Sequence, residues 1–383
     1  MCPDKNKVSY HTINEILGQP GLWKDTFQAL QSDDSRIRDF LTRWTKPERL
    51  QIVLTGAGSS AYIGESVEHL FRFHPGVTAR AVSTTTLVTH FKNHVDPSVP
   101  LLLISFARSG NSPESMATVD IAEKNCDELH HIAITCNPSG QLAQMIGERS
   151  DGLKLVLPPA SEDQGLAMTG SFTAMMLTAI YLSKLTAGTN ASSHNEIEHA
   201  SEMASQILKS GSSHLKSYAE KPFRRIIFLG SGPLKGIARE SQLKVQELTD
   251  GSVVGKYDSF LGFRHGPKAV IDSQTLVVFL FSPDEDTFRY EKDLAEEVLR
   301  EGIAKACIGI FAGQQQSEEL NLDLNLVLCP DKNPVPSEYN LLPYVIPAQL
   351  LGYYKSLKSG LNPDSPSVNH SISRVVQGVT IYR

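Results

Sequence analysis

Two copies of one strand–turn–helix pattern occur in this sequence, and this repeat constrains the fold more than any other feature. RIIFLGSGPLKGIARES, which starts at Arg225, repeats LQIVLTGAGSSAYIGES, which starts at Leu50. Gly56 and Gly230 are 174 positions apart, as are Leu102 and Leu276 in the next pair of strands. Two further strand pairs follow at a similar spacing, 131–134 with 307–310 and 154–158 with 325–330. Four matched strands predict a duplicated domain.

The predicted strands alternate with stretches of helical pattern, and this alternation indicates the fold class. In the first copy we expect strands at 52–54, 79–82, 101–104, 131–135 and 153–157, with helices between them. Such an order favours an α/β fold with parallel sheets that helices cover on both faces. We expect a helical leader at 1–44, a first domain at 45–205, a second domain at 206–365 and a C-terminal tail at 366–383.

The leader has the pattern of three short helices. Thr12 or Asn14 could cap the first, and Gln19-Pro20-Gly21 is expected to break it. Apolar spacing predicts a second helix from Trp23 and a third from Asp34 to Trp44.

Length and charge narrow the class of protein. The 383 residues, 40% of them apolar, suffice for two domains with large cores. A net charge of −6 gives no basic surface of the kind that binds nucleic acid. No apolar run reaches the roughly 20 residues of a membrane helix, and the polar N-terminus MCPDKNKVSY lacks a signal-peptide core. We therefore expect a cytoplasmic protein that binds neither membrane nor nucleic acid.

The cysteines indicate a reducing compartment and no cysteine-based site. They are odd in number, scattered, and form no CxxC pair: Cys2, Cys126, Cys136, Cys307 and Cys329. This pattern argues against a disulfide framework and against a zinc site. The sequence also has no His/Asp/Glu cluster that points to another metal, and we expect no cofactor.

A polar loop rich in hydroxyl groups follows the apolar strand at 101–104. It contains Ser105, Arg108, Ser109, Gly110, Asn111 and Ser112. Pro113 and Glu114 then have the character of a first helical turn, where proline is tolerated and acids favour the helix dipole. Backbone N–H groups, hydroxyls and the helix dipole would converge there on an anion, and Arg108 could add a cation. A phosphate site and an ordinary capped turn both remain open for this stretch.

The glycine turn of the first copy allows two interpretations. Gly56, Gly58 and Ala61 fit the G-x-G-x-x-G/A fingerprint of dinucleotide sites. That fingerprint also needs an acidic residue about 20 positions further on, and the stretch 78–83 has none. We favour a second phosphate loop, with Ser59 and Ser60 at a helix start. Both serine-rich loops follow the carboxyl ends of predicted parallel strands, where such sheets bind ligands.

The two copies differ at the loop that would hold the anion. The second copy has FSPDEDTFRYEK there, with Asp284, Glu285 and Asp286, and three acids would repel a phosphate. The second copy has instead the helix ARESQLKVQELTDG and the turn GFRHGP. Lys244 and Glu247 share a helix face and, read alone, could form an ordinary surface ion pair, while His265 could be structural.

Taken together, these motifs resemble the double-domain form of the SIS (sugar isomerase) family. The sequence is similar to the isomerase half of glucosamine-6-phosphate synthase and more so to AgaS-type galactosamine-6-phosphate deaminase/isomerases. The resemblance covers nearly the whole chain. It rests on TINEILGQPGLW, GAGSSAY, ARSGNSPES, GLAMTGSFT, KVQELTDG, FRHGP and the tail NPDSPSVNHSISRVVQGVTIY.

The resemblance implies a fold of two flavodoxin-like α/β/α sandwiches and assigns roles to residues of both copies. A sugar phosphate would be bound by residues of the first copy, namely Gly58, Ser59, Ser60, Arg108, Ser109, Gly110, Asn111 and Ser112. Glu247 would be the base that moves a proton between C2 and C1, on a helix face shared with Lys244 and Glu240. His265 would open the sugar ring in a partner's site, so the resemblance also implies a homodimer or higher homo-oligomer.

The sequence departs from the synthase pattern at two places. Ala107 and Arg108 replace a serine and a glutamine, which removes a hydroxyl and adds a cation. The tail offers Gln377 where the synthase has an imine-forming lysine, so we predict no Schiff base. Cys2 resembles the nucleophile of the synthase's glutaminase half, but only about 50 residues precede the first strand, too few for that domain. Without an ammonia source, the chemistry should run towards deamination.

The expected activity is conversion of a 2-amino-2-deoxyhexose 6-phosphate to a ketose 6-phosphate and ammonia. The closer AgaS likeness favours galactosamine 6-phosphate and tagatose 6-phosphate, although the residues themselves do not separate galacto from gluco substrates. Two alternatives remain. A plain ketose/aldose isomerase would share the site, and a non-catalytic sugar-phosphate sensor would need the phosphate loops but neither Glu247 nor His265.

Overall fold

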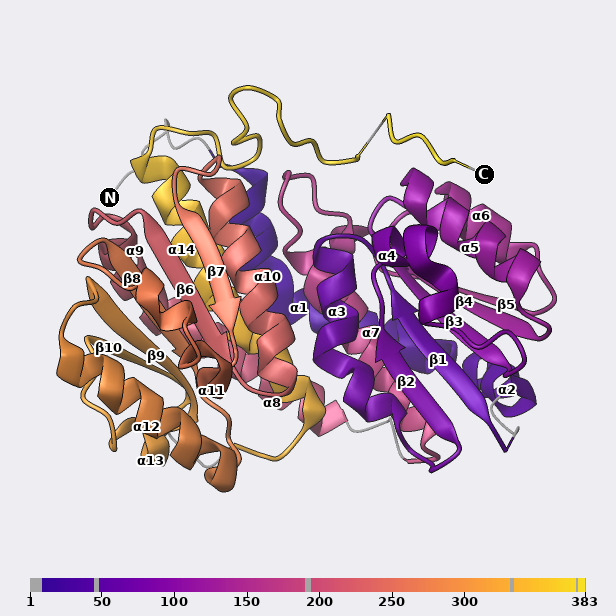
Figure 1. Ribbon diagram of the computed structural model, residues 1–383, viewed down its shortest axis with the longest axis horizontal. Helices are drawn as coiled ribbons and strands as arrows, with labels where there is room; N and C mark the ends of the chain where they lie inside the picture. Colours follow the sequence, from indigo (N-terminus) through magenta and orange to yellow (C-terminus); the bar gives the residue numbers. More distant parts are fainter. Residues whose placement is uncertain (1–8, 45–47, 190–193, 331–333, 377, 383) are drawn as a thin grey trace.

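The computed structural model describes residues 9–44, 48–189, 194–330, 334–376 and 378–382. Figure 1 shows two sheets side by side, each flanked by helices, with α1, α3, α7, α10 and α14 between them. The predicted duplication is therefore visible as two α/β halves of one molecule.

The first half contains a parallel sheet of five strands. They are β1 (Leu50–Thr55), β2 (Val77–Ala81), β3 (Leu101–Ala107), β4 (Leu129–Thr135) and β5 (Gly152–Val156), in the order β2-β1-β3-β4-β5. All four pairings are parallel. Every residue of β3 and of β4 is buried, which agrees with a sheet covered on both faces.

The second half repeats this sheet. Its strands are β6 (Arg225–Gly230), β7 (Val254–Asp258), β8 (Thr275–Leu280), β9 (Ala306–Gly313) and β10 (Leu324–Cys329), in the order β10-β9-β8-β6-β7. Read from the other edge, this is the strand order of the first sheet, and it is the flavodoxin-like order. The two flavodoxin-like sheets are thus confirmed, but our sequence analysis missed the edge strand β7.

Helices connect the strands and cover both faces of each sheet. In the first half they are α2 (Asp34–Trp44), α3 (Ser59–Val67), η1 (Glu68–Phe71), α4 (Thr84–His90), η2 (Phe91–Asn93), α5 (Pro113–Asn125), α6 (Gln141–Gly147), η3 (Pro159–Ser161) and α7 (Gly170–Thr186). In the second half they are α10 (Pro233–Leu248), α11 (Phe260–Phe263), η5 (Pro267–Val270), α12 (Glu285–Glu301), α13 (Gln314–Ser317), η6 (Glu338–Val345) and α14 (Ile346–Lys358).

The connection between the halves is helical from His194 to Ala219. It consists of α8 (His194–Gln206), a π-helical turn (Ile207–Gly211) and α9 (Ser212–Ala219). The helix expected to reach about Tyr218 is confirmed. Since α8 packs on β10 and η6, it contacts the second half, although the predicted boundary at 205/206 assigns nearly all of α8 to the first domain.

The leader differs from its prediction at two points. A single helix, α1 (His11–Ser32), runs through Pro20 without a break. Proline leaves the carbonyl of Ile16 without its helical donor, and the Gln19 side chain donates to that carbonyl at 3.2 Å. Neither predicted cap is used, because the Asp364 carboxylate accepts from the first backbone N–H groups of α1, at His11 (2.9 Å) and Thr12 (2.8 Å). A residue more than 350 positions away thus caps α1.

Helices α3 and α10 join the halves and lie antiparallel. A Cβ atom on Gly236 would lie 2.4 Å from Ser66 Oγ, so only glycine permits this approach of the two helices. Arg239 of α10 pairs with Glu65 of α3 near the same place. Because the helices are antiparallel, the C-terminal end of α10 lies beside the N-terminal end of α3. That end of α3 follows the carboxyl edge of the first sheet.

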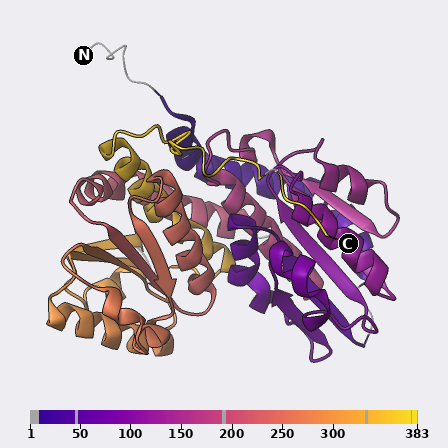
Figure 2. The same cartoon turned by 45° about the horizontal axis from the view of Figure 1, so that its top comes forward.

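The chain after α14 crosses back from the second half to the first. Figures 1 and 2 show this segment running as an irregular trace over both halves.

Candidate active site

The glycine turn after β1 presents two buried serines at the start of α3. Gly58, the residue before the helix, has φ of +56°, a conformation that favours glycine. A Cβ on Gly56 would lie 2.6 Å from Ser60 Cβ, so this glycine is also required. Ser59 and Ser60 are each 5% exposed, and the N-terminal turn of a helix favours an anion.

The second loop follows β3, the strand next to β1 in the sheet. Gly110 has φ of +68°, and Asn111 N donates to Ser109 Oγ at 3.3 Å. Ser112 precedes α5, and its hydroxyl lies 2.6 Å from Ser115 Oγ. The loop is therefore folded into a tight turn at the carboxyl edge, one strand away from the first loop.

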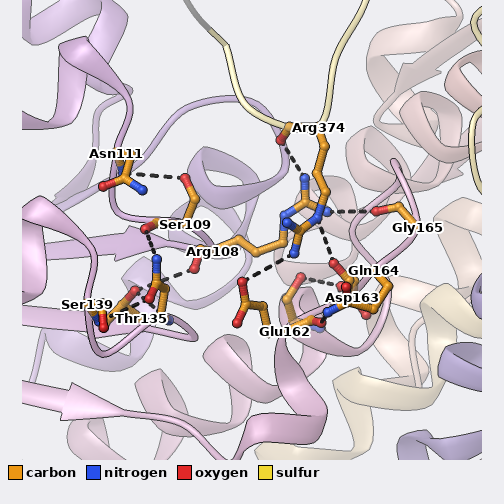
Figure 3. A network of polar contacts seen from close by, with 12 residues as sticks. Arg108, Ser109, Asn111, Thr135, Ser139, Glu162, Asp163, Gln164, Gly165 and Arg374 are labelled. Carbon is orange, nitrogen blue, oxygen red and sulfur yellow. Dashed lines mark hydrogen bonds and ion pairs between the residues drawn. The ribbon is translucent and has the colours of Figure 1, made fainter.

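The loop after β4 holds the Ser109 turn in place. Asn137 Nδ2 donates to Ser109 O at 3.0 Å, and Gln141 N donates to Asn111 Oδ1 at 3.0 Å. Figure 3 shows Ser109, Asn111, Thr135 and Ser139 gathered on one side of this network. A loop held from outside binds a ligand with a smaller entropy cost on ordering.

Arg108 points away from that cluster. Figure 3 shows its guanidinium directed toward Gly165 and Arg374. Nη1 donates to Gly165 O (3.3 Å) and Leu166 O (3.1 Å), and Nη2 donates to Arg374 O (2.6 Å). The side chain is 7% exposed. Its predicted role as a direct phosphate ligand stays a prediction, and every hydrogen bond it makes in the described chain goes to a backbone carbonyl.

Lys244 of α10 reaches across the interface to the first loop. Its Nζ donates to Ser59 Oγ at 3.0 Å and forms ion pairs with Glu247 Oε2 at 2.7 Å and Glu240 Oε1 at 3.2 Å. Lys244 and Glu240 are fully buried, whereas the Glu247 side chain is 23% exposed. The predicted Lys244, Glu240 and Glu247 thus share one helix face, and that face meets Ser59 of the other half.

The charges of this cluster depend on one another. Burial acts to lower the pKa of Lys244, but the two carboxylates beside it outweigh burial and raise that pKa. Burial raises the pKa of Glu240 to about 7, although Lys244 opposes the shift. Lys244 therefore stays charged, and Glu247 is the member of the cluster with access to a small molecule. This arrangement excludes the interpretation of Lys244 and Glu247 as an ordinary surface pair.

His265 does not join this cluster within one chain. It is exposed, in the turn between α11 and η5 that follows β7. Because β6 and β7 are parallel and α10 runs back between them, His265 lies near the carboxyl edge of the second sheet and Glu247 near the opposite edge. Two other residues weighed in the sequence, Cys2 and Gln377, lie outside the described residues.

Comparison with known proteins identifies the family. The SIS domain matches residues 47–182 and 221–333, one segment in each half. The chain belongs to the SIS domain family. The D-galactosamine-6-phosphate deaminase AgaS of Shewanella sp. is 38% identical over 377 residues, 98% of this chain and 92% of that protein.

Two further relatives agree with this result. The crystal structure of tagatose-6-phosphate ketose/aldose isomerase from Escherichia coli superposes with a TM-score of 0.87 at 35% identity, covering 100% of this chain and 99% of that one. Glutamine–fructose-6-phosphate aminotransferase [isomerizing] of Vibrio parahaemolyticus is 24% identical over 385 residues, 95% of this chain and 58% of that protein. The predicted family resemblance is confirmed.

The second SIS domain has an internal carboxylate at the position that corresponds to the Ser109 loop of the first. Four residues separate β8 from α12, against five between β3 and α5. Asp284 caps α12 by accepting from Thr287 N at 2.8 Å. Ser282 N donates to the fully buried Glu291 Oε2 at 2.7 Å, and burial raises the pKa of Glu291 to about 7. The Glu291 carboxylate thus accepts from the backbone N–H group of Ser282, which an anion would otherwise use. This contact agrees with the predicted loss of an anion site in the second copy.

Sequence reasoning missed the residues that support the site from a distance. Asp163 accepts from the backbone N–H groups of Thr169, Gly170 and Ser171 at 2.8–3.0 Å and so caps α7. Glu15 of α1 accepts from Gly165 N at 3.2 Å, and burial raises its pKa to about 7. The motif GLAMTGSFT marked the start of α7, but nothing in the spacing connected it to Asp163 or Glu15.

Proposed function

We propose that this protein is an amino-sugar phosphate deaminase/isomerase that converts D-galactosamine 6-phosphate to tagatose 6-phosphate and ammonia. The observation that carries the proposal is the Ser59–Lys244–Glu247 cluster, which joins the phosphate-side helix of one SIS domain to a carboxylate of the other. Relatives at 38% identity over nearly the whole chain are named D-galactosamine-6-phosphate deaminase. This similarity supports the same substrate here.

The phosphate would bind at the carboxyl edge of the first sheet. The helix starts at Ser59 and Ser112 and the turn at Ser109 supply hydroxyls and backbone donors from two adjacent loops. Arg108 would add a positive charge beside this turn. Because the phosphate lies far from the bonds that change, its binding energy serves to position C1 and C2 of the sugar.

Glu247 would be the base of the reaction. In the open-chain substrate it takes the proton from C2 while the aldehyde oxygen O1 gains a proton from solvent, which gives an enaminol with the double bond between C1 and C2. The C2 proton returns at C1 while the nitrogen releases a proton to solvent, which gives a ketimine. Water then adds to C2 and ammonia leaves, which completes the ketose. A carboxylate at the edge of a buried cluster is suited to this proton transfer.

Lys244 would orient Glu247 through the ion pair between Lys244 Nζ and Glu247 Oε2. Its bond to Ser59 fixes the position of that carboxylate relative to the phosphate loops. The distance between phosphate and base would then depend on the packing of α3 on α10, to which this contact belongs.

The ring-opening step would use His265 of a second copy. Its exposure and its place at the far edge of its own SIS domain support action in a neighbouring site. We therefore propose a homodimer or higher symmetric assembly with the active site at the interface. A cytoplasmic location belongs to the same proposal, and the free thiols of Cys126, Cys136 and Cys307 agree with a reducing compartment. In the described chain no helix is long and apolar enough to cross a membrane.

A plain ketose/aldose isomerase is the second candidate, because the Escherichia coli structure at 35% identity carries that name. Ammonia release separates the two functions. We expect ammonia from galactosamine 6-phosphate in stoichiometric amount with ketose, and less from glucosamine 6-phosphate. Ketose/aldose interconversion without ammonia would support the plain isomerase, and no turnover of either sugar class would support a sensor.

A further inference from the structure

The C-terminal segment (residues 364–376) connects the two SIS domains above the candidate site. Val368 N donates to Asp250 Oδ2, just beyond α10, at 3.1 Å. At the other end, Arg374 Nε donates to Asp163 O at 2.9 Å, and its Nη2 lies 3.4 Å from Glu162 Oε1. The segment is therefore anchored in both halves, and Figure 2 shows it extending across both.

Arg108 ties this segment to the anion loop. It is the residue between β3 and Ser109, and its guanidinium donates to Arg374 O and to the carbonyls of Gly165 and Leu166. One buried side chain thus connects three stretches of chain, as Figure 3 shows: the Ser109 loop, the loop before α7 and the C-terminal segment.

The cost of burying the Arg108 guanidinium indicates that its contacts with the carbonyl groups are needed. A buried guanidinium is costly unless hydrogen bonds compensate it. No carboxylate of the described chain accepts from Arg108, so carbonyl groups supply the compensation. Burial lowers the pKa of Arg108, and Asp163 opposes that shift. Loss of the Arg374 carbonyl would leave the cation short of an acceptor, and hydrogen bonds to charged groups are about twice as strong as neutral ones.

We propose that Arg108 is a positioning residue that fixes the C-terminal segment over the carboxyl edge of the first SIS domain. Order in the segment and order in the Ser109 loop then depend on each other. By thermodynamic linkage, a ligand that orders the loop strengthens the docking of the segment by the same factor that the segment strengthens ligand binding. This consequence for substrate rests on the proposed function, whereas the docking itself does not.

Hydrogen exchange of the backbone amides tests the docking without any need for turnover. The amides of Val368, His370 and Ile372 are hydrogen-bonded in the docked segment. We expect Arg108→Ala to speed exchange in 366–376 by about tenfold, the effect of one lost hydrogen bond to a charged group. Arg108→Lys keeps the charge but not the fork, and should give an intermediate effect. Arg72→Ala, which removes an arginine bonded to the Ala79 carbonyl elsewhere in the first half, is the matched control.

Kinetics test the coupling. We expect Arg108→Ala to raise KM for the sugar phosphate, and we expect the same of a chain that ends at residue 365. The protein with both changes should have a KM no higher than that of either single variant. Wild-type exchange in both Arg108 variants would overturn the docking role. If the increase in KM of the combined variant equals the product of the two separate increases, Arg108 acts on the phosphate independently of the segment. If Arg108→Ala does not fold, Arg108→Lys carries the exchange test, because it keeps the charge and loses the forked contact with the Arg374 carbonyl. Failure of the deaminase proposal would leave the exchange result unaffected.

Discussion

Lys244 Nζ lies 3.0 Å from Ser59 Oγ and 2.7 Å from Glu247 Oε2. A buried cation thus bridges the two SIS domains, with Ser59 at the start of α3 on one side and the candidate base Glu247 on the other. Since α3 and α10 are antiparallel, this contact brings the carboxyl edge of the first sheet to the C-terminal end of α10. The first copy of the domain thus contributes Ser59 to this cluster, and the second copy contributes Lys244 and Glu247.

Removal of Lys244 should destabilise the protein as well as inactivate it. Lys244→Met leaves the fully buried Glu240 without its cation, and breaking a buried pair in this way costs about 3–5 kcal/mol. Urea unfolding monitored by circular dichroism measures the loss. The double variant Lys244→Met/Glu240→Gln should recover part of it, because no buried charge is then left without a partner. An unchanged unfolding midpoint in Lys244→Met would contradict the ion-pair network.

The serines of the two copies should respond differently. Ser109→Ala should raise KM for the sugar phosphate, since a hydrogen bond to a charged group is worth roughly 1.5–3 kcal/mol. Ser282→Ala, at the corresponding loop of the second SIS domain, should change KM little, because its backbone N–H already donates to Glu291. Steady-state kinetics compare the two. Equal increases in KM at both positions would refute the assignment of the phosphate to the first domain.

Stability should fall in mild acid because of His131. This side chain of β4 is buried, and within the described part of the chain neither ring nitrogen has a hydrogen-bond partner. Burial, helped by Arg149, lowers its pKa to about 4, below the usual value of about 6.5. The unfolded chain therefore binds the proton first, so this contribution is complete above about pH 6.5 and is lost as pH falls towards 4.

Thermal unfolding of wild type and His131→Leu checks this sign. The stability difference between the two proteins should shift in favour of the leucine variant as pH falls from about 7.5 to about 4.5. A difference that does not change with pH would show that His131 is not held neutral. Asp151 and His130 also face this ring, and both proteins retain them.

The assembly can be tested by mixing two inactive proteins. Glu247→Gln lacks the proposed base, and His265→Ala lacks the proposed ring-opening group. If His265 acts in a partner's site, a mixed dimer contains one intact site and one doubly defective site. Such a dimer should regain up to about half of the activity of a wild-type dimer. Native mass spectrometry confirms the exchange of subunits. Exchanged but inactive mixtures would place His265 in its own subunit's site or outside catalysis.

The sequence predicted most of the fold because the information was local or periodic. Four strands of each sheet are apolar runs followed by glycine or polar turns, and the repeat aligned them. The strand β7 (VGKYD) was not predicted because it is an edge strand. None of its residues is fully buried, so its sequence lacks an apolar run. The helix α1 was predicted to break at Pro20, and it continues because the Gln19 side chain supplies the missing donor.

The candidate site was less predictable because its contacts are long-range. Spacing alone placed Lys244 and Glu247 on one helix face, but only the packing of α3 on α10 shows that this face is buried against Ser59. Nothing local connects Arg108 with Arg374, or Asp163 with Arg374, since more than 200 residues separate each pair. The assigned roles of the site residues and the domain boundaries remain predictions.

The central claim is that Glu247 moves the C2 proton, and Glu247→Gln tests it most directly. Glutamine keeps the size of the side chain and a hydrogen-bond acceptor for Lys244, so substrate binding should be retained. We expect kcat to fall by roughly 10²–10⁴, and exchange of the C2 proton with deuterated water, followed by NMR, to be abolished. A variant that binds substrate and still exchanges that proton at the wild-type rate would contradict the account.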